Sequence, residues 1–186
     1  MSALRLVTPA AEHLPQYVAA IEAGWSPSNV NGPALAAAEL VQIRHNAAAF
    51  LSGLTDPAGK GGPISLPDGR VVPRLPGWRR WMWDGEFCGT IGFRHQPGTS
   101  ELPDYVLGHI GYAVVPWKRG RGVATAALGL LLAEIRPLGM DYVELTTDPD
   151  NAVSQKVIRA NGGVLIGQFD ATAYDKVELL WRIALT

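Results

Sequence analysis

The stretch HIGYAVVPWKRGRGVATAA, residues 109–127, determines which fold we expect for the whole chain. Its first part alternates in the manner of a strand and stops at Pro116, which has no N–H to donate and fits a strand end. Basic residues and the loop Gly120-Arg121-Gly122 come next, and the residues from Val123 to Ile135 have the pattern of a helix. The stretch therefore predicts a strand, a glycine loop and a helix in direct succession.

A strand, a glycine loop and a helix start together form a site for an anion. The first N–H groups of a helix have no partner within the helix, and the helix dipole favours negative charge by about 0.3–1 kcal/mol at exposed sites and up to ~2 kcal/mol at partly buried ones. Gly120 and Gly122 let the backbone approach a ligand, and Lys118, Arg119 and Arg121 add positive charge. We expect a phosphate or a diphosphate to bind here.

Two motifs resemble those of a known family. Arg119-x-x-Gly122-x-Ala124 resembles the Arg/Gln-x-x-Gly-x-Gly/Ala signature of the GNAT acyltransferases. The second motif resembles the family's Asn-x-x-Ala/Ser helix that ends in glycine, and it comprises Asn151, Ser154, Gly162 and Gly163. The resemblance covers residues 80–170 by motif, and the length of the chain is compatible with resemblance throughout.

The resemblance implies an α+β fold in three layers (α/β/α), with a mixed, mostly antiparallel central sheet of about seven strands that splays apart to form a cofactor cleft. The length of 186 residues favours a single domain over residues 1–186. Within it, residues 56–77 form a Gly- and Pro-rich insertion that is too long for a simple connection. This insertion is either a lid on the substrate side or a surface loop with a short strand around Val71.

Hydrophobic periodicity and turn residues place the remaining elements. Strands are expected over residues 4–7, 78–84, 86–94, 110–115, 141–147, 164–169 and 176–185, and helices over 10–23, 34–54, 123–135 and 151–161. In the third of these strands, Phe87, Ile91 and Phe93 are expected on one face. Gly89 and Gly92 indicate a bulge or a close backbone approach in the same strand.

The charge balance and the cysteine content exclude several classes of function. Lys and Arg number 16 against 17 Asp and Glu, so the net charge is −1 and nothing favours a nucleic acid or an anionic membrane as a partner. Cys88 is the single cysteine, which excludes an internal disulfide, and a cytoplasmic location is expected. We expect no signal peptide, and no apolar stretch approaches the ~20 residues that span a bilayer.

The resemblance implies acetyl-CoA as the co-substrate and no metal. In the family the cofactor lies where the central strand and the strand after the helix splay apart, so the backbone of Ala113, Val114 and Val115 would pair with the pantetheine arm. The diphosphate would lie on the loop and the first helical turn, at Arg119, Gly120, Arg121, Gly122, Val123, Ala124 and Thr125. Asn151 would fix the pantetheine arm from the opposite wall.

The activity implied by the resemblance is N-acetyl transfer, in which an amine attacks the thioester directly in a ternary complex. Many members protonate the CoA thiolate with a tyrosine seven residues after the asparagine, where this chain has Ile158. Ser154 occupies a position where some relatives carry a serine proposed for that role. Ser154 could equally be a small residue that packs the helix against the sheet.

The general base has more than one candidate. Some relatives carry a glutamate five residues before the asparagine, where this chain has Thr146, which cannot act as a base. His109, at the start of the central strand, has an unperturbed pKa of ~6.5 that suits proton transfer, and it is the preferred base. It could instead be a histidine hydrogen-bonded at a strand end, in which case a water chain would replace it. His95 and Glu144 are weaker candidates.

The acceptor is implied only as a small-molecule or peptide amine, and a homodimer is compatible with the resemblance because dimers are common in the family. Trp78, Trp81 and Trp83 could form a platform for a cation or belong to the core. A dinucleotide site built on Gly120-x-Gly122 lacks its third glycine, since Thr125 stands there. The other alternative is a catalytically silent CoA-binding sensor or scaffold with the same fold, because the family's tyrosine and glutamate are both absent.

Overall fold

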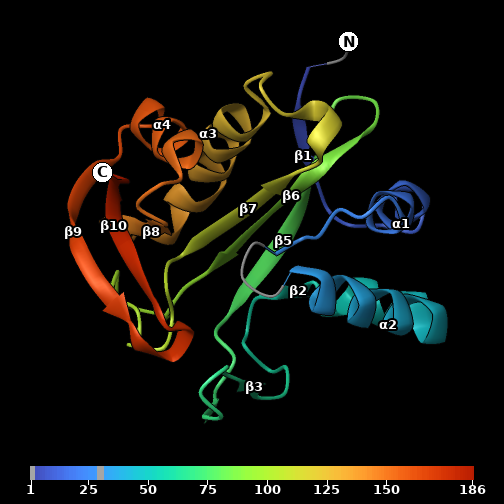
Figure 1. The fold of residues 1–186 in the computed structure, drawn as a ribbon, viewed down its shortest axis with the longest axis horizontal. Helices are drawn as coiled ribbons and strands as arrows, with labels where there is room; N and C mark the ends of the chain where they lie inside the picture. Colours follow the sequence, from blue (N-terminus) through green and yellow to red (C-terminus); the bar gives the residue numbers. More distant parts are fainter. Residues whose placement is uncertain (1–2, 29–31) are drawn as a thin grey trace.

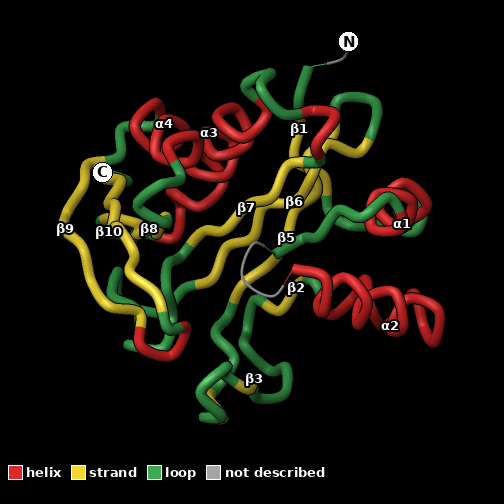
Figure 2. Tube along the Cα trace, viewed as in Figure 1, coloured by secondary structure: helices red, strands yellow, loops and turns green. Residues whose placement is uncertain are grey.

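The computed structural model describes residues 3–28 and 32–186, which form two main sheets and four α-helices (Figures 1 and 2). The larger sheet has the strand order β1-β5-β6-β7, with β2 beside β5, and the second sheet has the order β8-β10-β9. Strands β3 and β4 form a separate hairpin. The elements are β1 (Arg5–Val7), α1 (Leu14–Glu22), α2 (Gly32–Gly53), β2 (Thr55–Asp56), β3 (Ile64–Ser65), β4 (Val71–Val72), β5 (Gly77–Trp83), β6 (Phe87–Arg94), β7 (Ile110–Val114), the 3-10 turn η1 (Pro116–Lys118), α3 (Val123–Ile135), η2 (Arg136–Leu138), β8 (Tyr142–Thr147), α4 (Ala152–Ala160), β9 (Val164–Ala171), η3 (Thr172–Tyr174) and β10 (Lys176–Ala184).

Helices cover both faces of the larger sheet, which gives the fold three layers (Figure 1). On one face, α1 and α2 pack against a cluster that includes Trp81 and Val115. On the other face, Leu128 and Leu131 of α3 belong to a core that also holds Ile91 of β6 and residues of α4 and the second sheet. The predicted α+β fold with mostly antiparallel strands is confirmed, although the strands are divided between two main sheets instead of one sheet of about seven.

The central strand, loop and helix form where the sequence predicts them. β7 is followed by η1, which begins at Pro116, and α3 spans Val123–Ile135 as expected. Gly122 precedes α3 with a left-handed φ of 76°, a conformation that glycine adopts without steric cost. The chain therefore enters the helix with a sharp turn that leaves the helix start uncovered.

A bulge in β6 changes which side chains share a face of that strand. The pairing of β6 with β5 shifts by one residue, because Cys88 is an extra residue in β6. As a result Phe87 packs on the side of α1 and α2, whereas Ile91 and Phe93 pack on the side of α3. The expectation that these three side chains share one face is therefore wrong.

Of the two glycines singled out in β6, one lies at a close backbone approach. A Cβ at Gly89 would overlap the carbonyl oxygen of Ala113 in β7, and its φ is 145°. A Cβ at Gly92 would have no atom nearer than 3.9 Å, so the close approach expected there is absent. Gly89 thus lets β6 and β7 come together at the bulge.

The N-terminal half departs from the expected element bounds in two places. α1 begins at Leu14, later than expected, with a proline in its first turn, where the missing N–H does no harm. α2 is kinked at Asn46 (φ −158°, ψ 93°), whose side-chain oxygen accepts the N–H of Ala49 over 2.9 Å.

The insertion at residues 56–77 contains β3 and β4, and β4 is the short strand expected around Val71. Within the described ranges, no helix is both long and apolar enough to cross a bilayer.

Candidate active site

A cleft opens where the two main sheets separate, between β7 and β8. The strands meet at one end, where the N–H of His109 donates to the carbonyl oxygen of Glu144 over 2.7 Å. Across residues 3–28 and 32–186, no ladder pairs β7 with β8. The resulting cavity, which we call the central cleft, encloses about 530 Å³. Its lining includes Arg79, Gly92, Arg94, Gly111, Tyr112, Asn151, Ser154, Tyr174 and Glu178.

One backbone edge of β7 is paired with β6 and the other faces the cleft. At the end of the β6–β7 ladder, the N–H of Val115 donates to the carbonyl oxygen of Cys88 over 3.0 Å. Because backbone directions alternate along an antiparallel strand, Ala113 also faces β6, and Val114 faces the cleft side. Of the three residues predicted to pair with a pantetheine arm, Val114 is the one whose backbone has that orientation.

The glycine loop after β7 leaves the start of α3 open. Gly120 has a φ of 72° and Gly122 a φ of 76°, and at either position a Cβ would have no atom within 4 Å. Residues 120–122 are exposed, and no side chain caps α3 at Gly122. Arg119 holds the loop against the end of β7, because its Nε–H donates to the carbonyl oxygen of Val114 over 3.1 Å. The first N–H groups of α3 therefore have no side-chain cap, and the binding of an anion there stays a prediction.

Lys118 does not add its charge to this loop, contrary to the expectation from sequence. It is buried, and its ammonium group lies 3.0 Å from both carboxylate oxygens of Asp84 and 3.0 Å from Glu86. Hydrogen bonding to Asp84 and Glu86 raises the pKa of Lys118. The side-chain charge of the loop is thus left to Arg119 and Arg121, both of which are exposed.

Two hydroxyl groups meet where α4 approaches β7. Asn151 caps α4, since its Oδ1 accepts the N–H of Ser154 over 3.0 Å. The Oγ of Ser154 lies 2.6 Å from the phenol oxygen of Tyr112, which belongs to β7. Burial raises the pKa of Tyr112, so its phenol keeps its proton at neutral pH. The fold thus brings two of the predicted residues, Asn151 and Ser154, together with a tyrosine that the sequence analysis did not single out.

His109 is fully buried and does not belong to the lining of the central cleft. Its Nδ1 accepts the N–H of Glu144 over 2.9 Å, which leaves the ring proton on Nε2. Among the described residues, Nε2 has no hydrogen-bond partner. Burial lowers the pKa of His109 to about 4. The ring joins β7 to β8, and its role as a general base stays a prediction that this geometry does not favour.

Because His109 is buried, acidification should lower the free energy of unfolding of the protein. In the unfolded chain the ring has its ordinary pKa of ~6.5, whereas in the folded protein burial lowers the pKa to about 4. Between these values the unfolded state binds a proton that the folded state does not, so the free energy of unfolding falls as the pH drops through this interval. The loss at the lower end is about 3 kcal/mol, since one pKa unit corresponds to ~1.4 kcal/mol.

Chemical denaturation at a series of pH values measures this loss. In His109→Asn, whose side-chain oxygen can still accept the N–H of Glu144, the loss over the same interval should be smaller by about 3 kcal/mol. His45→Asn changes an exposed histidine of α2 and should keep the wild-type pH dependence. A wild-type pH dependence in His109→Asn would contradict the buried, neutral ring.

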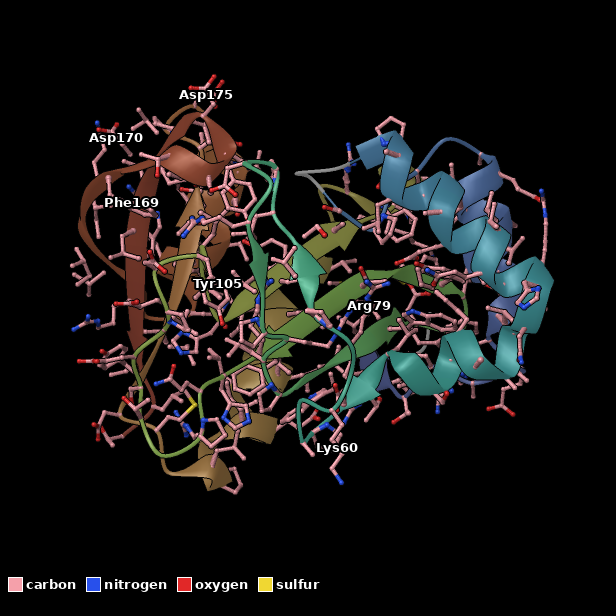
Figure 3. The ribbon with its side chains drawn as sticks, turned by 90° about the horizontal axis from the view of Figure 1, so that it is seen from below. Lys60, Arg79, Tyr105, Phe169, Asp170 and Asp175 are labelled. Carbon is pink, nitrogen blue, oxygen red and sulfur yellow. The ribbon has the colours of Figure 1, made fainter. Side chains whose placement is uncertain are left out.

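Sequence reasoning did not find the charged residues of the central cleft, among them Arg79, Arg94 and Glu178. Figure 3 shows Arg79 between the larger sheet and α2, where its Nη1 donates to Glu39 over 2.9 Å and to the phenol oxygen of Tyr17 over 3.2 Å. The phenol of Tyr17 also hydrogen-bonds Glu39. The sequence signal for this group is a pair of adjacent arginines in an otherwise apolar strand, which does not distinguish a site from a solvated edge.

Other side chains singled out from the sequence lie in the core. Trp81 and Trp83 are buried beside α1, so Trp78 is the one member of the expected tryptophan platform that lines the cleft. Cys88 is buried, and burial raises its pKa to about 11, which keeps the thiol protonated. His95 stacks on a core phenylalanine of β6, with 5.3 Å between the ring centroids.

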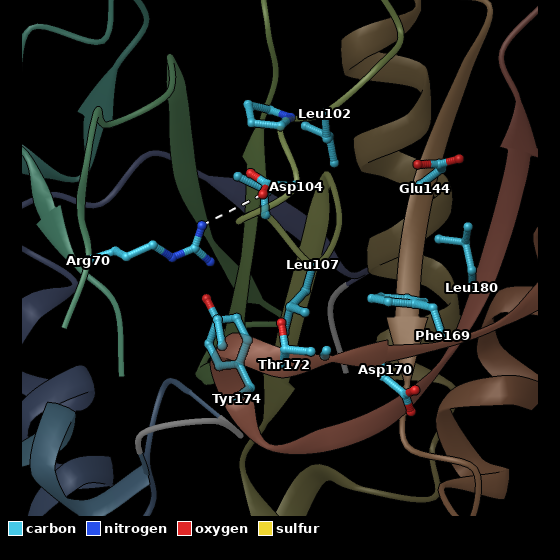
Figure 4. A pocket seen from close by; sticks show the side chains of 14 residues that line it. Arg70, Leu102, Asp104, Leu107, Glu144, Phe169, Asp170, Thr172, Tyr174 and Leu180 are labelled. Carbon is cyan, nitrogen blue, oxygen red and sulfur yellow. Dashed lines mark ion pairs between the residues drawn. The ribbon is translucent and has the colours of Figure 1, made fainter. Parts of the chain in front are cut away.

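A second pocket, of about 400 Å³, lies beside the central cleft (Figure 4). It is lined by residues 102–104 and 106–107, by β9 and by Tyr174, and Tyr174 also lines the central cleft. Glu144, a weaker candidate base, lies here and pairs with Arg182 over 2.7 Å. Arg70 pairs with Asp104 over 3.6 Å in the same pocket. Asp104 and Glu144 of this pocket are therefore each paired with an arginine of the protein.

The sequence of this chain is similar to those of known proteins. A family model described as an acetyltransferase (GNAT) domain matches residues 71–164. L-2,4-diaminobutyric acid acetyltransferase of Nocardia farcinica (strain IFM 10152) is 33% identical over 136 residues, which are 63% of this chain and 70% of that protein.

Solved structures show the same fold at low sequence identity. The RimL ribosomal L7/L12 alpha-N-protein acetyltransferase, in complex with coenzyme A, superposes with a TM-score of 0.65 at 14% identity and covers 99% of this chain and 95% of its own. The microcin C7 self-immunity acetyltransferase MccE, in complex with acetyl-CoA and AMP, has a TM-score of 0.61 at 13% identity and covers 97% of this chain and 92% of its own. Together with the family match, these likenesses lead to one conclusion: the chain belongs to the GNAT family and is an acetyltransferase.

Proposed function

We propose that the protein transfers the acetyl group of acetyl-CoA to an amine acceptor by direct attack within a ternary complex. The observation that carries this proposal is the open edge of β7, which leads from the uncapped start of α3 to the hydroxyl pair of Tyr112 and Ser154. The diphosphate would be held by residues 119–125 and the pantetheine arm by Val114, with Asn151 on the opposite wall. The relative named for 2,4-diaminobutyrate makes small amines the first acceptors to test.

The reaction fixes how many protons must move. The acceptor nitrogen forms a C–N bond with the thioester carbonyl carbon, and the C–S bond breaks. An acceptor that starts as an ammonium ion loses one proton before it attacks and a second after the C–N bond has formed. The CoA sulfur takes up one proton, and the other leaves to solvent. Because a lysine-type amine has a pKa of ~10.4, the first deprotonation needs assistance near neutral pH.

We assign Ser154 to the departing sulfur. Its hydroxyl would donate a hydrogen bond as negative charge develops on the thiolate, and the phenol of Tyr112, 2.6 Å away, would orient that hydroxyl. Tyr112 is then a positioning residue that acts through Ser154. For the proton of the ammonium group, the occupied Nδ1 and the burial of His109 favour a water chain over the histidine.

Incubation with acetyl-CoA and a panel of amines tests the proposed function. The panel contains 2,4-diaminobutyrate, 1,3-diaminopropane and a tripeptide with a free N-terminus. We expect thiol release that depends on the amine, with one N-acetylated product for each thiol in the mass spectrum. Binding of acetyl-CoA without any product would support the silent CoA-binding alternative, and no binding of acetyl-CoA would overturn the proposal.

Ser154→Ala should lower kcat about tenfold, because it removes a hydrogen bond to a group that becomes charged. The KM for acetyl-CoA should change little, since the hydrogen bond strengthens only as the C–S bond breaks. Tyr112→Phe should have a smaller effect, and the double variant should be no slower than Ser154→Ala, because the phenol acts through the serine. Steady-state kinetics of the four proteins measures this coupling.

Tyr142→Phe is the control for the hydroxyl pair, because Tyr142 lies in β8 outside the lining of the central cleft. It should keep the wild-type kcat. If the double variant lost kcat by the product of the two single losses, the two hydroxyl groups would act independently. That result would contradict the arrangement in which the phenol of Tyr112 orients the hydroxyl of Ser154.

A further inference from the structure

We propose that the acceptor end of the central cleft recognises a small zwitterion, with Arg94 binding its carboxylate and Glu178 binding an ammonium group. The inference rests on the acetyl transfer proposed above and specifies the class of acceptor. It follows from two opposite charges in one cavity, neither of which is fully neutralised by the protein.

Arg94 provides a cation without a counter-ion. Its Nη2 lies 3.6 Å from the position that a Cβ of Gly111 would occupy, so the guanidinium group extends from the end of β6 over β7. Within residues 3–28 and 32–186, no carboxylate forms an ion pair with Arg94, whereas the neighbouring Arg79 is paired with Glu39 at 2.9 Å. Arg94 is exposed, so its guanidinium group is accessible to a ligand in the cleft. A carboxylate from a ligand would supply the missing counter-ion in a planar, two-pronged geometry.

Glu178 provides a buried anion with one unused oxygen. Its residue exposure is 2%, and it lines the central cleft from β10. One carboxylate oxygen pairs with Lys176, and Oε2 is buried with no hydrogen-bond partner among the described residues. Lys176 also pairs with Asp148, at 3.1 Å. One ammonium group therefore balances two carboxylates, and the three side chains together keep a net charge of about −1. Because a buried carboxylate oxygen without a partner is unfavourable, an ammonium donor from a ligand would complete this group.

The sheet surface beside Arg94 leaves room for a small ligand. Gly92 of β6 lies directly opposite Gly111 of β7, so no side chain rises from the sheet at that point. A Cβ at Gly92 would still have no atom nearer than 3.9 Å. The cavity of about 530 Å³ must also admit the end of the pantetheine arm. The remaining space fits an amino acid better than a folded protein substrate.

Matched acceptors test the carboxylate half of the inference. The probes are 2,4-diaminobutyrate, its carboxamide and 1,3-diaminopropane. All three have both amines, but only 2,4-diaminobutyrate has a carboxylate. Wild-type protein should use diaminobutyrate with a kcat/KM at least tenfold above that of the other two. Arg94→Met should remove this preference by raising the KM for diaminobutyrate, and it should leave kcat/KM for diaminopropane within about twofold.

Glu178→Gln tests the ammonium half, and it should lower kcat/KM at least tenfold for all three acceptors. The controls are Arg80→Met and Glu134→Gln, which remove the same chemical groups from an ion pair of 2.7 Å between β5 and α3, outside the cleft. Both controls should keep the wild-type acceptor preference. Thermal unfolding of each variant shows whether it is folded.

The outcomes separate this inference from the proposed function. If calorimetry shows no binding of acetyl-CoA, the proposed function fails. If acetyl-CoA binds and the diamine or a tripeptide is acetylated as well as the diamino acid, the zwitterion site alone is overturned. An unchanged preference in Arg94→Met overturns the zwitterion site as well. Transfer to none of the probes despite binding of acetyl-CoA overturns both the zwitterion site and the proposed acetyl transfer.

Discussion

Gly122→Asp should weaken the binding of acetyl-CoA by about a hundredfold while the melting temperature changes by only a few degrees. Gly122 has a φ of 76°, a region that aspartate tolerates better than most residues, and its Cβ would meet no atom within 4 Å. The new carboxylate would lie beside the first N–H groups of α3, where we place the diphosphate. Losing that interaction costs up to ~2 kcal/mol, and repulsion between the carboxylate and the diphosphate adds about 1 kcal/mol at ~4 Å in water.

Gly139→Asp is the matched control for this substitution. Gly139 has nearly the same backbone conformation (φ 71°, ψ 23°), its Cβ would also meet no atom within 4 Å, and it follows η2 beyond the far end of α3. Both variants should lose the same small amount of stability, but only Gly122→Asp should lose affinity. Calorimetric titration with acetyl-CoA and thermal unfolding measure the two quantities. Equal affinities would remove the basis for placing the diphosphate on this loop.

The segment from β7 to α3 could be predicted from the sequence because its signals are local. Pro116 ends the strand region, and α3 begins and ends at the predicted residues. α4 begins and ends one residue inside its predicted bounds of 151–161, with Asn151 as its N-cap and Gly162, with a φ of 83°, after its end. In each case the residue that sets the boundary lies within a few positions of it, so no knowledge of the tertiary fold is needed.

The contacts that complete the site could not be predicted, because they join residues far apart in the sequence. Tyr112 and Ser154 are separated by 42 positions. Alternation in the strand indicates the face on which Tyr112 lies, but nothing in the sequence says which helix covers that face. The ion pair of Lys118 could not be predicted either, since its partner Asp84 lies 34 positions earlier in the sequence. This pairing holds the ammonium group of Lys118 away from the glycine loop.

The faces of β6 were misassigned for a different reason. Strict alternation assumes that each residue of a strand has one partner, and the extra residue Cys88 breaks that assumption. Gly89 correctly predicted a bulge or a close backbone approach in β6. A glycine in the sequence does not show, however, at which residue the alternation of side chains shifts. The bulge matters for the site because Gly89, beside the extra residue, lies against Ala113 and Val114 of β7, whose other edge faces the cleft.

Gly89→Ala should lower the free energy of unfolding by about 3 kcal/mol or more, although it adds a single methyl group. A φ of 145° is a conformation that other residues rarely adopt, which costs about 1–3 kcal/mol. The methyl group would also overlap the carbonyl oxygen of Ala113 and lie 2.8 Å from the Cα of Val114. Relief of these contacts requires β7 to move, so acetyl transfer should fall together with stability.

Gly92→Ala separates the effect of the methyl group from the effect of its position. Gly92 lies in the same strand, opposite Gly111, and its Cβ would make only ordinary van der Waals contacts, the nearest at 3.9 Å, so stability should be kept or slightly raised. The methyl group would stand on the floor of the central cleft, and we expect a higher KM for the acceptor with unchanged affinity for acetyl-CoA. Chemical denaturation and steady-state kinetics measure both variants. If Gly89→Ala were as stable as Gly92→Ala, β6 and β7 would not meet at the bulge described here, and the assignment of Val114 to the cleft edge would fail with it.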